Sequence, residues 1–424
     1  MKKILLFSLI LFIELFTSVQ KVSAMPEAFK DENFYKCIID SYNDEYNENL
    51  SYNDDLSEED LQKIYRLDCS IPFKYKDESR KINNILGIEK LINVWQLQMY
   101  GNNISEIDLS NNIKLKEVDF RVNNIKNVDL SKNSKLTKIS FTSNNISEID
   151  LSNNVNLNDL DLANNNISEI DLSNNVNLNY LNLANNNISE IDLSNNVNLY
   201  TINISYNKLK FLDFNKNDKI TRIVATDNNL NKINLSNNLK LEELLLSFNE
   251  LKDLNLYNNI NLQEISVNSN KIKSLNLCNN KSLQKIFTYY EDITDYIINN
   301  NSNLEINATH GVHGTGYGSL GKNLQYNSLN KNILDINEEG KINIINSGKA
   351  TIEIKDIKNY LILFDVVNEC PGDQNNVVDI IAKTEQTIKN PSTSDINIAI
   401  IGVVTLITLT GVIVSVRRLK KLSK

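Results

Sequence analysis

Asp-Leu-Ala-Asn-Asn-Asn-Ile-Ser-Glu-Ile-Asp-Leu-Ser-Asn-Asn, residues 161–175, returns 21 residues later at 182–196 with only its first residue changed. Two asparagines of this stretch recur at the same spacing without a gap, one from Asn102 to Asn270 and the other from Asn112 to Asn280. A short, fixed period indicates a solenoid, in which each coil buries its apolar face against its neighbours.

Each coil contains two short apolar pairs, and each pair is followed by an asparagine. Leu160 and Leu162 alternate with polar residues, as do Ile170 and Leu172, and this is the spacing of β-strands. Each pair therefore predicts a short strand. An Asn side chain carries both a donor and an acceptor. Stacked asparagines can thus satisfy the buried backbone groups of the turns.

The repeated L-x-x-L-x-L-x-x-N-x-I pattern, which begins at Val94, resembles the leucine-rich repeat family in its short bacterial form. The resemblance implies a β-rich solenoid over residues 94–306. The run from Gly87 to Val94 is similar to the segment that leads into the repeats of internalin-like surface proteins. Those proteins bind protein partners, and the resemblance implies the same role for this chain.

Both ends of the chain carry targeting patterns. Residues 1–24 have the basic start, apolar core and small-residue end of a secretory signal peptide; an N-terminal membrane anchor is the alternative. Residues 396–416 form an uncharged apolar stretch long enough to span a bilayer, with a basic tail after it.

The segment before this stretch adds a sorting motif, so residues 390–424 resemble the sorting signal of Gram-positive surface proteins cut by sortases. The resemblance implies that a sortase links Thr393 to peptidoglycan, giving a secreted, wall-anchored protein that spans the membrane before sorting. Asn390 and Ser394 depart from the common residues around Pro391, which leaves the sortase class open. A single-pass membrane anchor is the alternative.

An α-helical N-terminal cap is expected at residues 25–93, because a solenoid's end coil would otherwise expose its core. Phe34, Ile38 and Tyr42 share one helix face, and Ser57 opens a capping box. Cys37 and Cys69 both lie in this cap, and a secreted chain favours a disulfide between them; two buried free thiols are the alternative. Cys278 is interpreted as packing, and Cys370 has no evident partner in the sequence.

The 21-residue period stops before residues 307–368, which contain strand-like runs separated by turns. They resemble the immunoglobulin-like modules of bacterial surface proteins, so an all-β C-terminal module is expected there. Residues 369–389 are expected to form a polar spacer next to the wall.

Catalytic chemistry is sparse. The two histidines, His310 and His313, lie in a glycine-rich stretch without a completing Cys or carboxylate, so no metal, cofactor or enzyme activity is expected. The net charge of −9 excludes a nucleic-acid partner. The carboxylates of Glu148, Asp150 and their repeats are interpreted as a solvated acidic edge, with a cation-binding column as the alternative.

Outward residues of the strand segments turn aromatic and apolar in the later coils, and such residues are enriched at interfaces. The predicted ligand-binding residues are Tyr180, Tyr206, Arg222, Leu245, Phe248, Phe287, Tyr289 and Tyr290. Packing of Phe287, Tyr289 and Tyr290 under the C-terminal module is the alternative for those three. The sequence thus favours a surface protein for protein recognition or adhesion. A cell-wall or glycan-binding structural protein is the second hypothesis, and a secreted hydrolase is the least supported.

Overall fold

The structure is a computed structural model that describes residues 26–72, 78–288, 295–298, 304–308, 324–355, 361–367 and 370. The expected signal peptide and the sorting signal lie outside these residues, as does the wall-proximal spacer apart from Cys370. The chain divides into two compact units, Met1–Asn156 and Leu157–Lys424, and the division falls inside the repeats.

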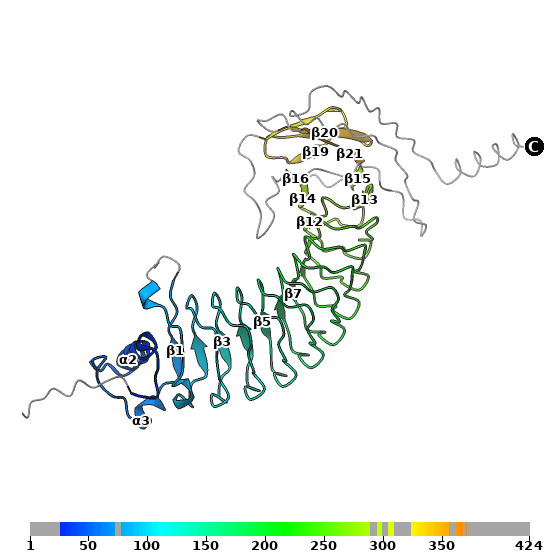
Figure 1. Ribbon diagram of the computed structural model, residues 1–424. Coiled ribbons are helices and arrows are strands. Elements are labelled where there is room, and N and C mark those ends of the chain that lie inside the picture. The colour runs from blue at the N-terminus through cyan, green and yellow to red at the C-terminus, as the bar shows by residue number, and fades with distance from the viewer. Residues whose placement is uncertain are drawn as a thin grey trace, which may run out of the picture. The chain divides into compact units, whose positions relative to one another are not determined.

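The first unit opens with the cap (Figure 1). Helix α2 (Glu32–Tyr46) is capped by Asp31, whose side chain accepts hydrogen bonds from the N–H groups of Asn33 and Phe34. The helix buries the apolar face predicted from the sequence. Helix α3 (Glu58–Leu61) is capped by Ser57. Two short 3₁₀ turns, η1 (Glu78–Arg80) and η2 (Ile88–Lys90), lead to the repeats.

Four parallel strands follow in this unit, one from each coil, paired in register. They are β1 (Arg66–Asp68), β2 (Gln96–Gln98), β3 (Glu117–Asp119) and β4 (Lys138–Ser140). The middle residue of each strand points into the core, as Leu97, Val118 and Ile139 show by their burial. The alternation seen in the sequence therefore places the middle side chain of each strand inside.

The second unit continues the same parallel arrangement. Its long sheet runs through β5 (Asp159–Asp161), β6 (Tyr180–Asn182), β7 (Thr201–Asn203), β9 (Arg222–Val224), β11 (Glu243–Leu245), β12 (Glu264–Ser266), β14 (Lys285–Thr288) and β16 (Glu305–Ala308). The expectation of a strand in the second half of every coil is wrong for the segment around Ile170 and Leu172, which has no strand assignment. That half forms strands only later, at β8 (Phe211–Asp213), β10 (Lys232–Asn234), β13 (Ser274–Asn276) and β15 (Asp295–Ile297).

The C-terminal strands join the solenoid. β17 (Gln325–Ser328), β20 (Lys349–Lys355) and β21 (Leu361–Val367) are antiparallel, and β18 (Leu334–Ile336) with β19 (Ile342–Ile344) forms a hairpin. β21 also pairs in parallel with β15, so the sheet order is β13-β15-β21-β20-β17. The strands expected in this region are present, but an independent immunoglobulin-like module is not confirmed. β21 instead pairs with the repeat strand β15 and covers an edge of it that would otherwise be unpaired.

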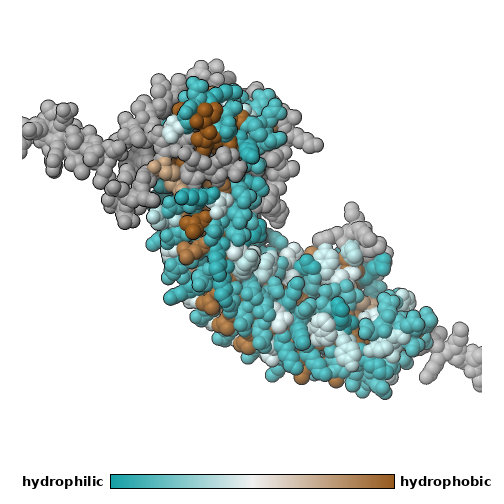
Figure 2. Space-filling model, turned by 180° about the vertical axis from the view of Figure 1, so that it is seen from behind, coloured by the Kyte–Doolittle hydropathy of each residue, from teal (hydrophilic) through white to brown (hydrophobic). Residues whose placement is uncertain are grey.

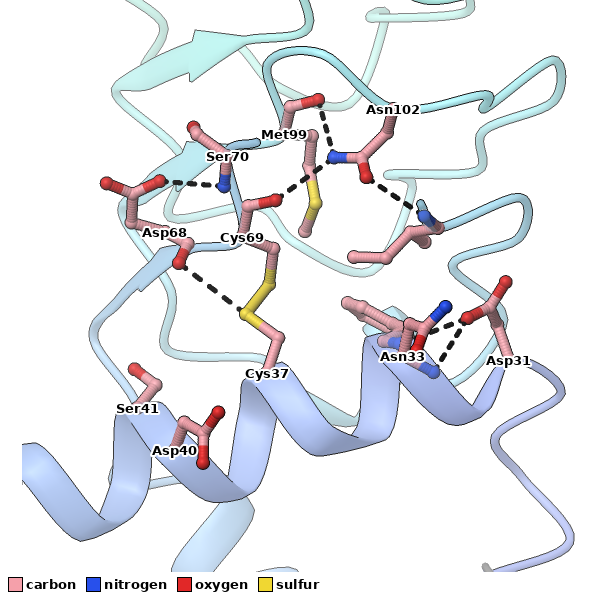
Figure 3. Close-up of a disulfide and its surroundings, with 12 residues drawn as sticks. Asp31, Asn33, Cys37, Asp40, Ser41, Asp68, Cys69, Ser70, Met99 and Asn102 are labelled. Carbon is pink, nitrogen blue, oxygen red and sulfur yellow. Dashed lines mark hydrogen bonds between the residues drawn. A yellow bond between two sulfur atoms is a disulfide. The ribbon is translucent and has the colours of Figure 1, made fainter. Parts of the chain in front are cut away.

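Two disulfides join segments that are distant in sequence. Cys37 on α2 bonds to Cys69 directly after β1, with 5.7 Å between their Cα atoms (Figure 3). Cys278 bonds to Cys370, also with 5.7 Å between the Cα atoms. The interpretation of Cys278 as simple packing is therefore wrong. This bond ties the segment after β21 to the coil after β13, across 92 residues of sequence.

Candidate recognition face

The first asparagine ladder is the series from Asn102 to Asn270, and the second is the series from Asn112 to Asn280. The first ladder holds the turns that follow the strands of the long sheet. Asn186 shows the pattern: its Nδ2 donates to the carbonyls of Leu162 and Leu183 at 3.0 and 3.1 Å, and its Oδ1 accepts from the N–H of Ile167 at 3.0 Å. Each such side chain therefore bonds its own coil and the preceding one. Asn102 does the same at the cap, where its Nδ2 reaches the carbonyls of Cys69 and Met99 (Figure 3).

The second ladder is satisfied on one side only. Asn196 Nδ2 donates to the carbonyls of Leu172 and Asn175, each at 3.0 Å. Its Oδ1 is buried and accepts no hydrogen bond within the protein, and the same holds for Asn133, Asn217 and Asn238. The two asparagine series have the same spacing in the sequence. In the structure, the side-chain oxygen of Asn186 in the first series accepts a backbone hydrogen bond that the oxygen of Asn196 in the second series lacks.

The residue before each asparagine of the first ladder has a positive φ. In the second unit the series comprises Asn164, Asn185, Tyr206, Asp227, Phe248 and Ser269, with φ between 52° and 58°. Aromatic residues rarely take this left-handed conformation. The shared turn geometry places the residues of the series at equivalent points of successive coils, and these include Tyr206 and Phe248.

We use the name recognition face for two sets of side chains of the second unit: those that point outward from β6, β7, β9, β11, β12 and β14, and those of the positive-φ series. Tyr206, Arg222, Leu245 and Phe248 come together on three neighbouring coils and are all partly exposed. Tyr180 lies on the adjacent strand β6, where burial, with a further effect of the Asp161 carboxylate, raises the pKa of its phenol. These predicted residues therefore lie on four consecutive coils of the long sheet.

The other predicted residues differ in placement. Phe287 on β14 is only 8% exposed, which favours packing, the alternative left open by the sequence. Tyr289 and Tyr290 lie outside the described residues, as do His310, His313 and the sorting residues Asn390, Pro391, Thr393 and Ser394.

Ion pairs run along the strand starts of this face. Arg222 Nε lies 2.6 Å from Glu243 Oε2 on the next strand, and Lys285 Nζ lies 2.9 Å from Glu264 Oε1. Arg222 thus already has a carboxylate partner within the protein. Because both groups are partly exposed, we expect the pair to contribute little to stability and more to the position of the guanidinium.

The first unit has two aromatic residues on either side of strand β2 that were not included in the predicted site. Arg66 lies over the ring of Trp95 at 5.5 Å, and Arg121 lies over Tyr100 at 5.3 Å. Trp95 is the only tryptophan of the chain. Its place in the strand pattern, next to β2, is the sequence signal that could have identified it.

The acidic column has a structural role. The Oδ1 atom of Asp171 accepts the backbone N–H of Ser173 at 2.8 Å, and Asp108, Asp129, Asp150 and Asp192 repeat this turn. Hydrogen bonds from the Ser173 backbone and hydroxyl lower the pKa of Asp171. Within the described ranges no group of three His, Cys, Asp or Glu residues is placed to hold a metal ion.

Two other surface features lie away from the recognition face. A polar cleft in the first unit runs between α2 and the strands β1 and β2, and its walls carry charges of both signs, including Asp40, Asp44, Arg66 and Arg80. In the second unit exposed aliphatic side chains occupy the same position of four coils, at Val176, Val197, Leu239 and Ile260, and the coil between Val197 and Leu239 has Asp218 there. Figure 2 shows apolar side chains following one edge of the repeats.

No protein-family model and no curated protein sequence matches the chain. Solved structures do. The functional domain of InlJ from Listeria monocytogenes, which includes a cysteine ladder, is similar with a TM-score of 0.54 and 20% identity, over 81% of this chain and 97% of that chain. The internalin InlF from the same organism gives 0.54 and 22%, over 69% of this chain and 94% of that chain. At these identities the likeness shows a shared leucine-rich repeat fold.

No helix within the described part of the chain has the length and apolarity needed to cross a membrane.

Proposed function

We propose that this protein is a wall-anchored surface protein that recognises a protein partner through the recognition face. The observation that carries the proposal is the group of partly exposed Tyr206, Leu245 and Phe248 side chains on neighbouring coils. A rigid parallel sheet presents them with little loss of conformational entropy on binding, which favours affinity. The fold shared with two internalin structures supports a recognition role.

The chemistry of the face also supports a protein partner. Tyr and Arg are enriched among the residues that dominate binding energy, and they cluster near the centre of interfaces. Polar groups lie beside the apolar ones: Ser266 is the register partner of Leu245, and its hydroxyl oxygen lies 2.7 Å from that of Ser247. An aromatic and apolar centre with polar groups at its rim is typical of protein interfaces.

The test is adhesion of Gram-positive cells that display the full-length chain to candidate target cells. Tyr206→Asn combined with Phe248→Asn should weaken binding more than tenfold, because the double variant removes both aromatic contacts. Asparagine is the matched replacement, since Asn164 and Asn185 occupy the same turn position in this chain. The melting temperature of the variant should stay nearly unchanged.

The control variant is Asp119→Ala with Asp161→Ala, at outward positions of earlier coils. A loss of adhesion in this variant alone would place the site elsewhere. Treatment of the target cells separates the remaining hypotheses, because a protein partner is lost with protease whereas a glycan partner is lost with glycosidase.

A further inference from the structure

An apolar patch lies on the coils next to the second disulfide. Leu239 and Ile260 are each 53% exposed, and Tyr257 is 64% exposed, the highest value among the large apolar side chains that the structure describes as exposed. The two coils are joined at this patch, because Asn261 Nδ2 donates to the Leu239 carbonyl at 2.8 Å. We use the name apolar edge for Leu239, Tyr257 and Ile260.

The repeat does not require these side chains. Val176 and Val197 occupy the position of Leu239 in earlier coils, and Ser236 occupies the position of Tyr257 in the preceding coil. The side chains along this line therefore become larger towards the disulfide. Exposed apolar groups gathered in one place indicate a docking surface.

The second disulfide brings the end of the described chain to this edge. Cys278 has, in the next coil, the turn position that Tyr257 has in its own, and Asn279 Nδ2 donates to the Tyr257 carbonyl at 3.2 Å. Cys370 is bonded to Cys278. Residues 371–389 therefore leave the described fold one coil away from Tyr257.

The segment after Cys370 is mostly polar, but it contains one apolar run. Val377, Val378, Ile380 and Ile381 lie within five residues of each other. A spacer that only separates a folded unit from the wall needs a polar composition and no such run. The run lies outside the described residues, so its place is inferred from the apolar edge and from Cys370.

From these observations we propose that residues 377–382 dock on the apolar edge of the same chain. Docking removes both apolar surfaces from water, which is the main favourable term in association. The tether is long enough: seven residues from Cys370 to Val377 span up to about 23 Å, whereas the coil of Leu239 is two coils, roughly 10 Å, from that of Cys278. A short tether also gives the segment a high effective concentration.

Charge favours the same occupant. The coils of the apolar edge and of Cys278, residues 231–242, 252–263 and 273–284, contain five lysines against Glu242 and Asp253 as their only acids. Residues 371–382 contain Asp373 and Asp379, and the first basic residue after Cys370 is Lys383. Opposite charges therefore attract the segment to these coils. Docking leaves only residues 383–389 as free spacer, which holds the coils close to the anchor.

The experiment is hydroxyl-radical footprinting of the full-length protein, which measures the accessibility of the Tyr257 ring by its rate of oxidation. Tyr200 is the internal reference, because it is 55% exposed on an earlier coil and lies outside the apolar edge. We expect Tyr257 to be oxidised at least threefold more slowly than Tyr200. Replacing all four residues of the apolar run by Ser should raise the Tyr257 rate to that of Tyr200, with an unchanged melting temperature.

Ile388→Ser is the matched control, since it removes an apolar side chain from the same segment outside the run, and it should leave Tyr257 protected. Equal oxidation of the two tyrosines in the unchanged protein, or a Tyr257 rate unaffected by the fourfold replacement, would overturn the docking. Protection that disappears when the protein is diluted would assign the edge to a second copy of the chain and would overturn it as well.

Discussion

At the scale of single residues, one side chain of the first asparagine ladder holds several buried backbone groups by hydrogen bonds. Replacing Asn186 by Ala removes bonds to three carbonyls and leaves the Ile167 N–H without its acceptor. Unpaired buried groups of this kind cost about 1–3 kcal/mol. Asn187→Ala, one position further and off both ladders, should be nearly neutral. Melting temperatures of the two variants test this, and equal shifts would contradict the role of the ladder.

The second ladder allows a comparison between two asparagines that the sequence does not distinguish. Asn196 donates two hydrogen bonds and accepts none within the protein, whereas Asn186 does both. Asn196→Ala should therefore lower the free energy of unfolding by less than Asn186→Ala, with a difference of about 1 kcal/mol for the lost acceptor. Urea denaturation of the two variants measures this difference, and a larger effect at Asn196 would count against it.

Asp60 gives the cap a pH dependence. Hydrogen bonds from Ser57, Lys63 and Tyr42 hold the pKa of its carboxyl well below the usual range. Because the folded-state pKa is lowered, the stabilisation is present above the unfolded value of about 3.9 and is lost as pH falls towards the folded value. Asp60→Asn should cost roughly 1 kcal/mol at neutral pH, since the site is partly open to solvent.

The measurement is urea denaturation of the unchanged protein and the Asp60→Asn variant at two pH values. The gap between them should narrow from pH 7 to pH 2.5, and a gap that stays constant over this range would contradict the assignment. Asp44→Asn is the control, because this exposed carboxylate lies beyond the hydrogen bonds that surround Asp60.

At the scale of elements, the disulfides fix both ends of the described fold. In the chain-entropy model, closing the 32-residue separation of Cys37 and Cys69 contributes about 3–4 kcal/mol, and the 92-residue separation of Cys278 and Cys370 about 4–5 kcal/mol. Peptide mapping without reductant should recover both pairs. Free alkylation of all four thiols, or a Cys37–Cys278 peptide, would contradict the arrangement.

How much of the fold the sequence predicts depends on how local the determinant is. The strand residues Leu160 and Leu181 and the ladder position Asn186 follow from a fixed period, and their burial agrees with it. The pairing of β21 with β15 does not follow, because it joins segments on opposite sides of a long stretch that lacks the repeat. The Cys278–Cys370 bond could not be predicted for the same reason, because its two cysteines are far apart in sequence and Cys370 lies in a polar stretch.

The residues of the candidate site are likewise predictable only where the determinant is local in sequence. Outward positions such as Leu245 are readable from strand alternation alone. The left-handed turn is not readable at Tyr206 or Phe248, because local preference assigns that conformation to Gly and Asn. Only their alignment with Gly101 and Asn185, residues that favour a positive φ, reveals the series.

At the scale of the whole molecule, function depends on where the chain is held. Asn390, Pro391 and Thr393 precede an apolar stretch at 396–416 and a basic tail at 417–424, all outside the described residues. Thr393→Ala should remove the protein from the wall but keep it in the membrane, because the apolar stretch remains. Deletion of 417–424 should release it to the medium, because the basic stop is lost.

Cell fractionation after peptidoglycan digestion distinguishes these outcomes in cells expressing the full-length chain. Ser392→Ala, within the same motif but at its variable position, is the matched control and should remain linked to the wall. Wall fractions that still contain the Thr393→Ala protein would contradict covalent attachment at this residue. If the protein is found in the membrane with or without the change, a single-pass anchor replaces the sorting hypothesis, and the recognition face would be displayed from the membrane surface.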